Sequence, residues 1–310
     1  MRVGYLGPAG TYSEEALRAS APEGTEEVPY PTIYDAVMAV QGGAVDRAVV
    51  PIENALEGGV AITLDTLALE ADRVRITAEV VHPIHHCVVG ARRLALDDVT
   101  RVLSHPQAAA QCARFLRDRL PHAERVVAAS TADAVMSVRD APGPEVALGS
   151  RLAAELYGCV VLAADVEDHP DNATRFVWLA PADAGPAAET SPPEAAGAGP
   201  QTKTSIVFWG SGDESPGWLV AALREFSDRG VNLTRIESRP RRVQLGHYMF
   251  FADLEGHAAR PPVSDALEGL RTRVEGIRVL GSYASVGGAA GYTGRHRGSA
   301  RGPDVASRGG

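Results

Sequence analysis

A stretch of twenty residues rich in Ala, Pro and Gly divides the chain into two parts of different character. Between Pro181 and Pro200, fifteen of the twenty residues are of these three types, and such a segment has too little apolar bulk to join a core. We interpret residues 181–201 as a flexible linker. A second low-complexity stretch, residues 287–310, has four arginines and one acid and is predicted to be a disordered tail.

The part before the linker, residues 1–180, alternates strands with helices. A strand candidate at 2–6 is followed by a helical pattern at 12–20, and similar pairs recur along this part. The alternation predicts an α/β fold with mostly parallel strands and helices on both faces. Its length allows two lobes, for which the extended stretches near 76–90 and 160–168 are candidate crossovers.

The part after the linker, residues 202–286, has the order strand, helix, strand, strand, helix, strand. This order predicts a ferredoxin-like βαββαβ domain. A small domain with one open antiparallel sheet commonly associates with a second copy. We therefore expect a homodimer or a homotetramer.

Charge and composition narrow the class of protein. The formal net charge of −9 argues against nucleic acid as a partner, because a phosphate backbone binds basic surfaces. No apolar run approaches the roughly 18 residues of a transmembrane helix, and the first ten residues lack the apolar core of a secretory signal. The three cysteines have no CxxC spacing and indicate reduced thiols. These features favour a cytoplasmic protein without a membrane partner.

Polar residues recur where predicted strands end, and ligands of open α/β sheets bind at such strand ends. Thr11 and Ser13 follow a Gly-Pro turn at a helix start, which offers N–H groups to an anion. Glu53 and Asn54 follow a buried strand, and Ser104 ends another. Each feature is equally compatible with an ordinary helix cap or turn.

A predicted helix after Ser104 carries Gln107 and Gln111, which are four residues apart and share one helix face. The two amides are compatible with a polar wall beside a ligand, and equally with a polar helix face that is exposed to solvent.

The histidine-rich stretch "HPIHHC", residues 82–87, is a candidate metal site. In a strand, His82 and His86 would point to one face and His85 to the other. No acidic or cysteine cluster at ligand spacing accompanies them, so no metal site is predicted.

The segment Asn-Ala-Thr-Arg-Phe opens an apolar strand. Asn172 fits the N-glycosylation pattern, but that modification belongs to secreted chains. Strand alternation puts Thr174 and Phe176 on one face and Arg175 on the other. An arginine at a strand mouth can pair with a carboxylate, and a threonine can hydrogen-bond a leaving oxygen. A surface arginine and a strand-start threonine fit the pattern equally well.

Together, the blocks "GYLGPAGTYSEEA", "VPIENALEGGV", "SHPQAAAQC" and "DNATRFVWL" resemble the signature blocks of the prephenate dehydratase family, in the same order. The resemblance implies a two-lobed catalytic domain like a type II periplasmic binding protein at residues 1–180. It also implies an ACT regulatory domain at 202–286. The implied reaction is the decarboxylative dehydration of prephenate to phenylpyruvate in L-phenylalanine biosynthesis, without a cofactor or a metal.

By resemblance, Thr174 is essential to dehydration and assists the leaving hydroxyl, Arg175 holds a substrate carboxylate and Phe176 shapes the pocket. The other implied site residues line the pocket and steer protons, or bind substrate oxygens. They are Glu53, Asn54, Ser104 and Gln111 in the first role, and Thr11 and Ser13 in the second.

In the ACT domain, the resemblance implies feedback inhibition by L-phenylalanine, bound where two ACT domains pair. The implied effector residues are Gly217, Leu219, Val220, Asn232, Leu233, Glu237, Ser238, Arg239 and Pro240. Trp218 stands where the family usually has a small Ala, and we expect this larger side chain to alter the affinity for the effector.

Other functions fit the same scaffold. An arogenate dehydratase, or a prephenate decarboxylase that does not aromatise its product, would look similar, although the Thr-Arg-Phe block favours dehydration. A solute-binding protein or an amino-acid sensor is an alternative of a different class, because fold alone does not give function.

Overall fold

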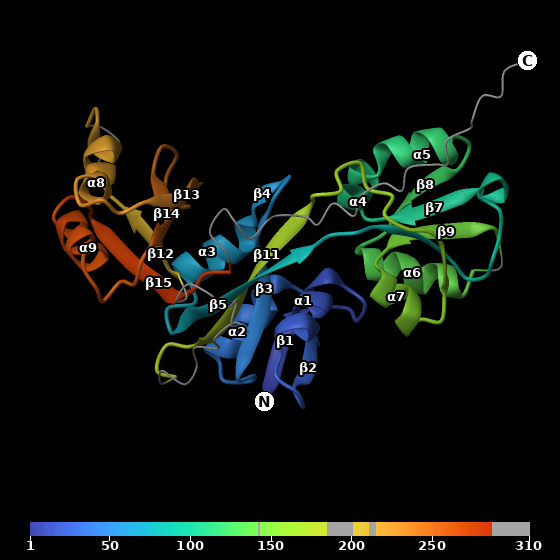
Figure 1. Cartoon of the computed structure of the whole chain (residues 1–310), viewed down its shortest axis with the longest axis horizontal. Coiled ribbons are helices and arrows are strands. Elements are labelled where there is room, and N and C mark those ends of the chain that lie inside the picture. Colours follow the sequence, from blue (N-terminus) through green and yellow to red (C-terminus); the bar gives the residue numbers. More distant parts are fainter. Residues whose placement is uncertain (142, 185–200, 211–214, 287–310) are drawn as a thin grey trace, which may run out of the picture.

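The computed structural model describes residues 1–141, 143–184, 201–210 and 215–286. Figure 1 shows a first lobe (blue) in the middle, a second lobe (green) on one side of it and a C-terminal domain (orange to red) on the other. Most of the predicted linker and the whole predicted tail lie outside the described residues. Within the described ranges, no helix is long and apolar enough to cross a membrane.

The first lobe has a mixed sheet in the order β2-β1-β3-β11-β5, with the short β4 paired to β3. Helix α1 packs on one face of this sheet, and α2 and α3 pack on the other. The strands are β1 (Arg2–Leu6), β2 (Glu26–Tyr30), β3 (Arg47–Asn54), β4 (Gly58–Gly59), β5 (Val74–Pro83) and β11 (Ala173–Pro181). The helices are α1 (Tyr12–Ser20), α2 (Ile33–Gln41) and α3 (Ala61–Leu69).

The second lobe has its own sheet in the order β10-β6-β9-β7-β8. Helices α4 and α5 pack on one face and α6 and α7 on the other. The strands are β6 (Cys87–Gly90), β7 (Arg101–Ser104), β8 (Glu124–Val127), β9 (Glu145–Gly149) and β10 (Val160–Ala163). The helices are α4 (Pro106–Gln111), α5 (Ala113–Arg119), α6 (Thr131–Arg139) and α7 (Arg151–Leu156), with a short 3-10 turn η1 (Leu96–Asp98) before β7.

The chain crosses between the lobes twice, first from β5 to β6 and then from β10 to β11. The two crossovers lie where the extended stretches of the sequence suggested. Strand β11 returns from the second lobe and therefore runs antiparallel to both of its neighbours, β3 and β5. The sheets are consequently more mixed than the mostly parallel arrangement that the strand–helix alternation predicted.

Two local features differ from the sequence patterns. The helix expected after Ser104 is broken at Cys112, whose backbone (φ −113°, ψ 23°) leaves the helical range and separates α4 from α5. Helix α6 was not singled out, although it begins with a recognisable cap: the Ser130 hydroxyl accepts the Asp133 backbone N–H at 3.0 Å.

The C-terminal domain is a four-stranded antiparallel sheet in the order β13-β14-β12-β15, which confirms the expected ferredoxin-like fold. Helix α8 begins after Gly217, which adopts a left-handed conformation (φ 83°). The elements are β12 (Thr202–Trp209), α8 (Trp218–Ser227), β13 (Leu233–Pro240), β14 (Tyr248–Glu255), α9 (Val263–Arg271) and β15 (Gly276–Ala284).

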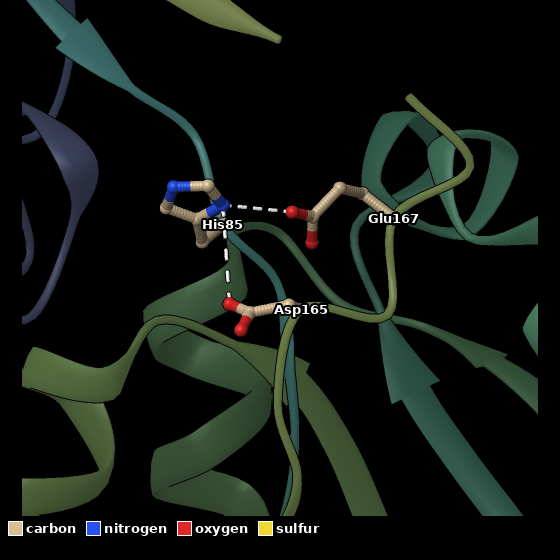
Figure 2. A group of neighbouring side chains, drawn as sticks. All are labelled: His85, Asp165 and Glu167. Carbon is tan, nitrogen blue, oxygen red and sulfur yellow. Dashed lines mark hydrogen bonds and ion pairs between the residues drawn. The ribbon is translucent and has the colours of Figure 1, made fainter. Parts of the chain in front are cut away.

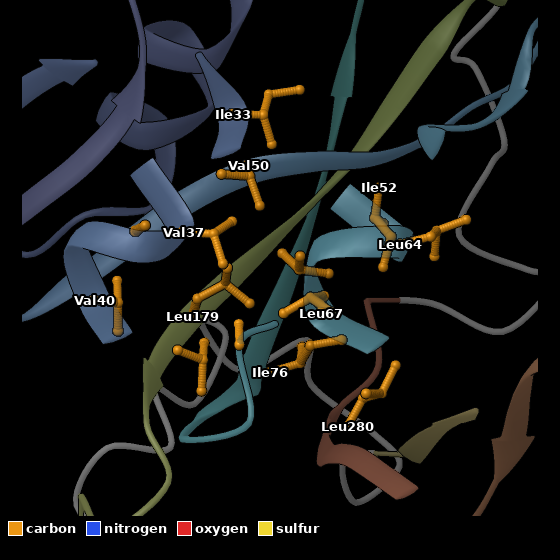
Figure 3. Packing of buried hydrophobic residues seen from close by; sticks show 14 of the residues in the cluster. Ile33, Val37, Val40, Val50, Ile52, Leu64, Leu67, Ile76, Leu179 and Leu280 are labelled. Atoms are coloured by element: carbon orange, nitrogen blue, oxygen red, sulfur yellow. The ribbon is translucent and has the colours of Figure 1, made fainter. Parts of the chain in front are cut away.

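The C-terminal domain and the first lobe share one hydrophobic cluster. Phe251 and Leu280 of the C-terminal sheet are buried in the same cluster as Ile76 and Leu179 of the first lobe, and Figure 3 shows Leu280 beside Ile76 and Leu67. The backbones approach closely here, because a Cβ atom added at Gly281 would lie 2.1 Å from the Ile76 carbonyl oxygen. Glycine at this position therefore permits the contact between β15 and β5.

Charged side chains secure the edge of the same interface. The Arg239 guanidinium of β13 donates to both carboxylate oxygens of Asp65 in α3, each at 2.9 Å, and Arg242 donates to the same carboxylate at 2.6 Å. Burial would raise the pKa of Asp65, but Arg239 and Arg242 outweigh it and lower that pKa.

This pKa shift gives a pH dependence of stability. An Asp with a lowered folded-state pKa stabilises the protein above its ordinary pKa of about 4, and this contribution is lost as pH falls through the folded value. We expect Asp65→Asn to lower the free energy of unfolding by about 2 kcal/mol at pH 7, and the difference from wild type to shrink below about pH 4.

Urea unfolding at several pH values measures this difference. Asp97→Asn, at an exposed acid of η1, is the matched control and should change stability little at any pH. A difference for Asp65→Asn that stays constant from pH 7 to pH 3 would contradict the expectation.

Candidate active site

Strands β3 and β11 pair so that two adjacent residue pairs face opposite sides of the sheet. The register sets Thr174 opposite Asn54 and Arg175 opposite Glu53. Because side chains alternate along a strand, the first pair lies toward the second lobe and the second pair lies toward the C-terminal domain. The hydrogen bonds of Asn54 with Thr174 and Asn172, and those of Arg175 with Glu53 and Asp253, confirm both directions.

The side-chain amide of Asn54 is oriented by the backbone. Its Oδ1 accepts the N–H groups of Leu56 and Glu57, each at 3.0 Å, so its Nδ2 is the donor group. This nitrogen lies 2.9 Å from Thr174 Oγ1 and 3.0 Å from Asn172 Oδ1. Thr174 therefore accepts a hydrogen bond from Asn54, and no acceptor among the described residues takes the hydrogen of its own hydroxyl.

The same reasoning extends across the junction of the lobes. Since Asn172 accepts through Oδ1, its Nδ2 donates to Gln111 Oε1 at 3.0 Å. Gln111 Oε1 also lies 2.9 Å from Nε2 of His86, and an amide oxygen can only accept. The Nε2 atom of His86 is therefore protonated. Within the described part of the chain, Gln111 Nε2 has no hydrogen-bond partner and remains available to a ligand.

Tyr12 completes this chain of polar groups on the far side of His86. Its hydroxyl lies 2.8 Å from His86 Nδ1 and 2.9 Å from the His85 carbonyl oxygen. Burial lowers the pKa of His86, against the opposing effects of its hydrogen bond to Gln111 and of the Glu167 carboxylate. The lowered pKa favours the neutral ring, with its proton on Nε2. Nδ1 is then an acceptor that shares the single Tyr12 hydroxyl hydrogen with the His85 carbonyl oxygen.

The predicted block at the start of α1 contributes to the contact between the lobes. Ser150 and Tyr157 of the second lobe donate to the carbonyl oxygens of Gly10 at 2.9 Å and Ala9 at 2.6 Å. Gly10 has φ 89°, and a Cβ atom there would lie 2.9 Å from the Ala153 Cβ. Only glycine suits this turn, which brings the start of α1 against the start of α7.

The remaining predicted residues on this side are buried near strand and helix ends. The Thr11 hydroxyl donates to the Leu6 carbonyl at 2.8 Å, and Ser13 is buried in the first turn of α1. Ser104 ends β7 and donates to the His105 carbonyl at 2.9 Å, whereas Gln107 is exposed.

Arg175 and Glu53 lie on the other face, against the C-terminal domain. The Arg175 guanidinium pairs with Glu53 at 3.0 Å, with Glu79 of β5 at 3.1 Å and with Asp253 of β14 at 2.7 Å. Its side chain is only 9% exposed. The expectation that Arg175 binds a substrate carboxylate stays a prediction, because in this arrangement its partners are carboxylates of the protein itself. The same holds for a pocket role of Glu53.

Phe176 returns to the first face, as strand alternation requires. It is buried with Tyr5, Leu17 and Trp178 between the sheet and α1, and its ring meets the edge of His82 at a centroid distance of 6.5 Å. It therefore supports the strand that carries Thr174.

His85 meets two acids at the crossovers (Figure 2). Its Nδ1 lies 2.7 Å from a Glu167 oxygen and 3.9 Å from an Asp165 oxygen, and Glu167 also accepts the His86 backbone N–H at 2.9 Å. The sequence analysis found no acidic partner for the histidines, because these acids are about eighty residues away in the chain. The three groups are close enough to hold a metal ion, but their contacts equally describe a clamp that joins the two crossovers.

The predicted effector residues fall into two groups. Gly217, Leu219 and Val220 form the start of α8, and Leu233 to Pro240 form β13, preceded by Asn232. Trp218 packs on Phe208 and Phe250, and its Nε1–H donates to the Arg273 carbonyl at 2.8 Å. Its larger ring is therefore accommodated by the core of the C-terminal domain.

Sequence reasoning missed the linking members of the polar chain, which are Tyr12, His86 and Asn172. Asn172 drew attention only as a glycosylation pattern, and His86 only as a possible metal ligand. No short-range signal could connect them, because each hydrogen bond joins residues 25 to 118 positions apart.

Comparisons with known proteins agree with this architecture. The family model described as prephenate dehydratase matches residues 3–184, and the model described as the ACT domain matches residues 204–272. A prephenate dehydratase of Amycolatopsis methanolica is 39% identical over 292 residues, which cover 93% of this chain and 90% of that relative.

Solved structures extend the likeness. The structure of prephenate dehydratase from Arthrobacter aurescens in complex with L-Phe is 38% identical, with a TM-score of 0.79, and the match covers 92% of this chain and 90% of that one. A structure described as GqqA, a novel type of quorum quenching acylase, is 31% identical with a TM-score of 0.77, covering 92% and 98%.

The donor and acceptor directions assigned to these hydrogen bonds can be tested by replacing the donor group of Asn54 with an acceptor. In Asn54→Asp, a carboxylate would face the oxygens of Asn172 and Ala173, which Asn54 Nδ2 now contacts at 3.0 and 3.2 Å. We expect a loss of about 2–4 kcal/mol in the free energy of unfolding, because a buried donor is replaced by an unpaired charge.

Urea denaturation gives this value. Gln107→Glu makes the same amide-to-carboxylate change at an exposed position of α4 and should lie within about 0.5 kcal/mol of wild type. Equal stability of the two variants would show that the Asn54 amide is not oriented as described.

Proposed function

The chain belongs to the prephenate dehydratase family, and we propose that it converts prephenate to phenylpyruvate, CO2 and water. One observation carries the mechanism: the Thr174 hydroxyl accepts a hydrogen bond from Asn54 Nδ2 at 2.9 Å, which leaves its own hydrogen for the substrate. Thr174 is therefore oriented as a donor toward a leaving hydroxyl.

The reaction needs little more than such donors. The ring carboxylate leaves as CO2, and the electron pair of its C–C bond enters the ring. The ring hydroxyl leaves with its C–O bond pair and takes up one proton to become water. Aromatisation of the ring drives the reaction forward. A donor placed at the departing oxygen stabilises the negative charge that develops there.

We assign the other residues of this face to binding. Gln111 Nε2 and the buried hydroxyls of Ser104 and Ser13 are neutral hydrogen-bonding groups near the junction of the lobes, and Thr11 stands at the start of α1. Helix starts offer backbone N–H groups to anions, which suits a substrate with two carboxylates. Contact between the lobes excludes water from the reacting centre.

The roles that the resemblance implies for Glu53, in lining the pocket and steering protons, and for Arg175, in holding a substrate carboxylate, stay proposals. To reach a substrate on the Thr174 side, the Arg175 guanidinium would have to leave Asp253 and Glu79. For the proton that the departing hydroxyl takes up, the two proposed donors are Thr174, acting with water, and Glu53.

We propose that L-phenylalanine regulates the enzyme through its ACT domain. The structure of the Arthrobacter relative with L-Phe supports this ligand. The proposed contacts are the start of α8, with Gly217, Leu219 and Val220, and the strand with Asn232, Leu233, Glu237, Ser238, Arg239 and Pro240.

Self-association through the ACT domain is part of the same proposal. Strand β13 is an edge strand, and apolar side chains are exposed on it and beside it, at Ile236, Val243, Leu245 and Tyr248. Unpaired strand edges with apolar neighbours favour pairing with a second copy. A homodimer or homotetramer in the cytoplasm agrees with a biosynthetic enzyme of this family.

The direct test is an assay of the purified protein with prephenate at neutral pH. Phenylpyruvate is measured by its absorbance in alkali, with and without L-phenylalanine, and arogenate is tested in parallel. We expect phenylpyruvate from prephenate and less of it with L-phenylalanine. Absence of phenylpyruvate would refute the proposed reaction, and a preference for arogenate would change the substrate.

Substitution of Thr174 tests the residue that carries the mechanism. Thr174→Ala removes the donor and should lower kcat by about 10² or more, while the protein stays folded by circular dichroism. Thr174→Ser keeps the hydroxyl and should retain most of the activity. Near-normal turnover of Thr174→Ala would remove Thr174 from its role.

A further inference from the structure

We propose that His86 is a positioning residue for the dehydration, acting through the chain of polar groups that ends on Thr174. This inference rests on the proposed function. The Nε2–H group of His86 donates to Gln111 Oε1, and this bond fixes which end of the Gln111 amide faces the reacting centre. His86 lies outside the four sequence blocks that carry the family resemblance, and the proposed reaction does not by itself require a histidine.

The chain has a fixed direction because both of its ends are anchored. At one end, two backbone N–H groups require Asn54 Oδ1 to accept. At the other end, Nε2 of His86 donates to Gln111, and the Tyr12 hydroxyl lies between Nδ1 of the same ring and the His85 carbonyl oxygen, at 2.8 and 2.9 Å. Gln111 Oε1 receives a donor from each side, from His86 at 2.9 Å and from Asn172 at 3.0 Å.

The consequence is that the amide of Gln111 cannot turn over. Turning it would set its NH2 group against two donors and leave buried hydrogen bonds unmade, which is unfavourable because the buried groups find no water to replace the lost partners. The NH2 group of Gln111 and the hydroxyl hydrogen of Thr174 are then both held as donors. Two preset donors suit a substrate whose departing group and carboxylates are all acceptors.

The chain also passes between the lobes. Tyr12 belongs to the first lobe and His86 to a crossover, Gln111 closes α4 of the second lobe, and Asn172 lies at the entry to β11. Separation of the lobes would break the chain at the bonds between these residues. The donor arrangement is therefore complete only when the lobes are in contact, as they are at Gly10 and Ser150.

Two substitutions of His86 separate donation from packing. In His86→Gln, the side-chain amide nitrogen can take the place of Nε2 and donate to Gln111, so kcat should stay within about tenfold of wild type. His86→Leu fills similar space without a donor, and kcat should fall about 10²-fold with a smaller change in KM. His122→Gln, at an exposed site of the second lobe, is the matched control and should leave kcat unchanged.

Equal losses of kcat in His86→Gln and His86→Leu would overturn the proposal, because a packing role does not distinguish them. A measurement on the unaltered protein guards against variants that fail to fold. The ¹⁵N side-chain shifts of His86 should report a protonated Nε2 and an unprotonated Nδ1, and the opposite tautomer would overturn the proposal. An unaltered protein without dehydratase activity would instead refute the proposed function.

A separate observation, on the other face of β11, concerns regulation. We infer that the contact between Arg175 and Asp253 couples the position of the ACT domain to the adjacent residue Thr174. The Arg175 guanidinium is held by Glu53 and Glu79 of the first lobe and by Asp253 of the ACT domain. A displacement of Asp253 would leave a buried charge without part of its compensation, or would move Arg175 with it.

Within the ACT domain, further hydrogen bonds hold the Asp253 carboxylate in place. The Ser205 hydroxyl donates to Asp253 Oδ1 at 2.5 Å and must therefore accept from the Tyr283 hydroxyl at 2.6 Å. Burial would raise the pKa of Asp253, but Arg175 foremost, together with Ser205, Arg235 and Lys203, lowers it. Lys203 adds a second bridge between the domains, because its Nζ lies 2.8 Å from Glu79.

The test compares inhibition with binding. In Asp253→Asn, the inhibition reached at saturating L-phenylalanine should fall by at least half, whereas calorimetric binding of L-phenylalanine should persist. Ser205→Ala, a milder change, should shift inhibition in the same direction. Asp265→Asn, at an exposed acid of α9, should retain full inhibition.

Full inhibition of Asp253→Asn and Ser205→Ala at saturation, with binding intact, would overturn the coupling role. An unaltered protein that binds L-phenylalanine without being inhibited would overturn it as well. Activity without any binding of L-phenylalanine would refute the proposed regulation and leave the proposed reaction standing.

Discussion

The antiparallel pairing of β3 with β11 is the constraint on which the rest of the structure depends. It sets Thr174 opposite Asn54 and Arg175 opposite Glu53, one residue apart on the same two strands. Alternation then sends the first pair toward the junction of the lobes and the second pair toward the ACT domain. A slip of the register by one residue would exchange the two faces and destroy both arrangements.

The buried polar chain at the junction relies on neutral groups. Amides, hydroxyls and an uncharged imidazole lose less free energy on burial than ions do, provided that each hydrogen bond is made. The backbone N–H groups after Asn54 give the chain its direction without any charge. On the other face, where ions are used, Arg175 is compensated by carboxylates from two domains. The polar groups buried on one face are therefore neutral and hydrogen-bonded, whereas those buried on the other face are ions of opposite charge.

Much of this fold and part of the site were predictable from local patterns. The strand and helix order of the ACT domain and the two crossovers follow from hydrophobic periodicity, and alternation placed Arg175 opposite to Thr174 and Phe176. The partners of these side chains were not predictable. The contact of Arg175 with Asp253 and that of His86 with Gln111 depend on how separate elements pack, and no spacing along the chain encodes that packing. The break at Cys112 and the antiparallel entry of β11 have the same origin.

The shared hydrophobic cluster around Ile76 and Leu280 limits how the ACT domain can be separated from the catalytic domain or exchanged for another. The linker marks two units of sequence, yet the apolar side chains on either side of it form a single body. An ACT domain exchanged for that of a relative would have to match the surface of the first lobe, including the bare backbone at Gly281. The regulatory domain is therefore not an interchangeable module, because its inner surface and that of the first lobe form one hydrophobic core.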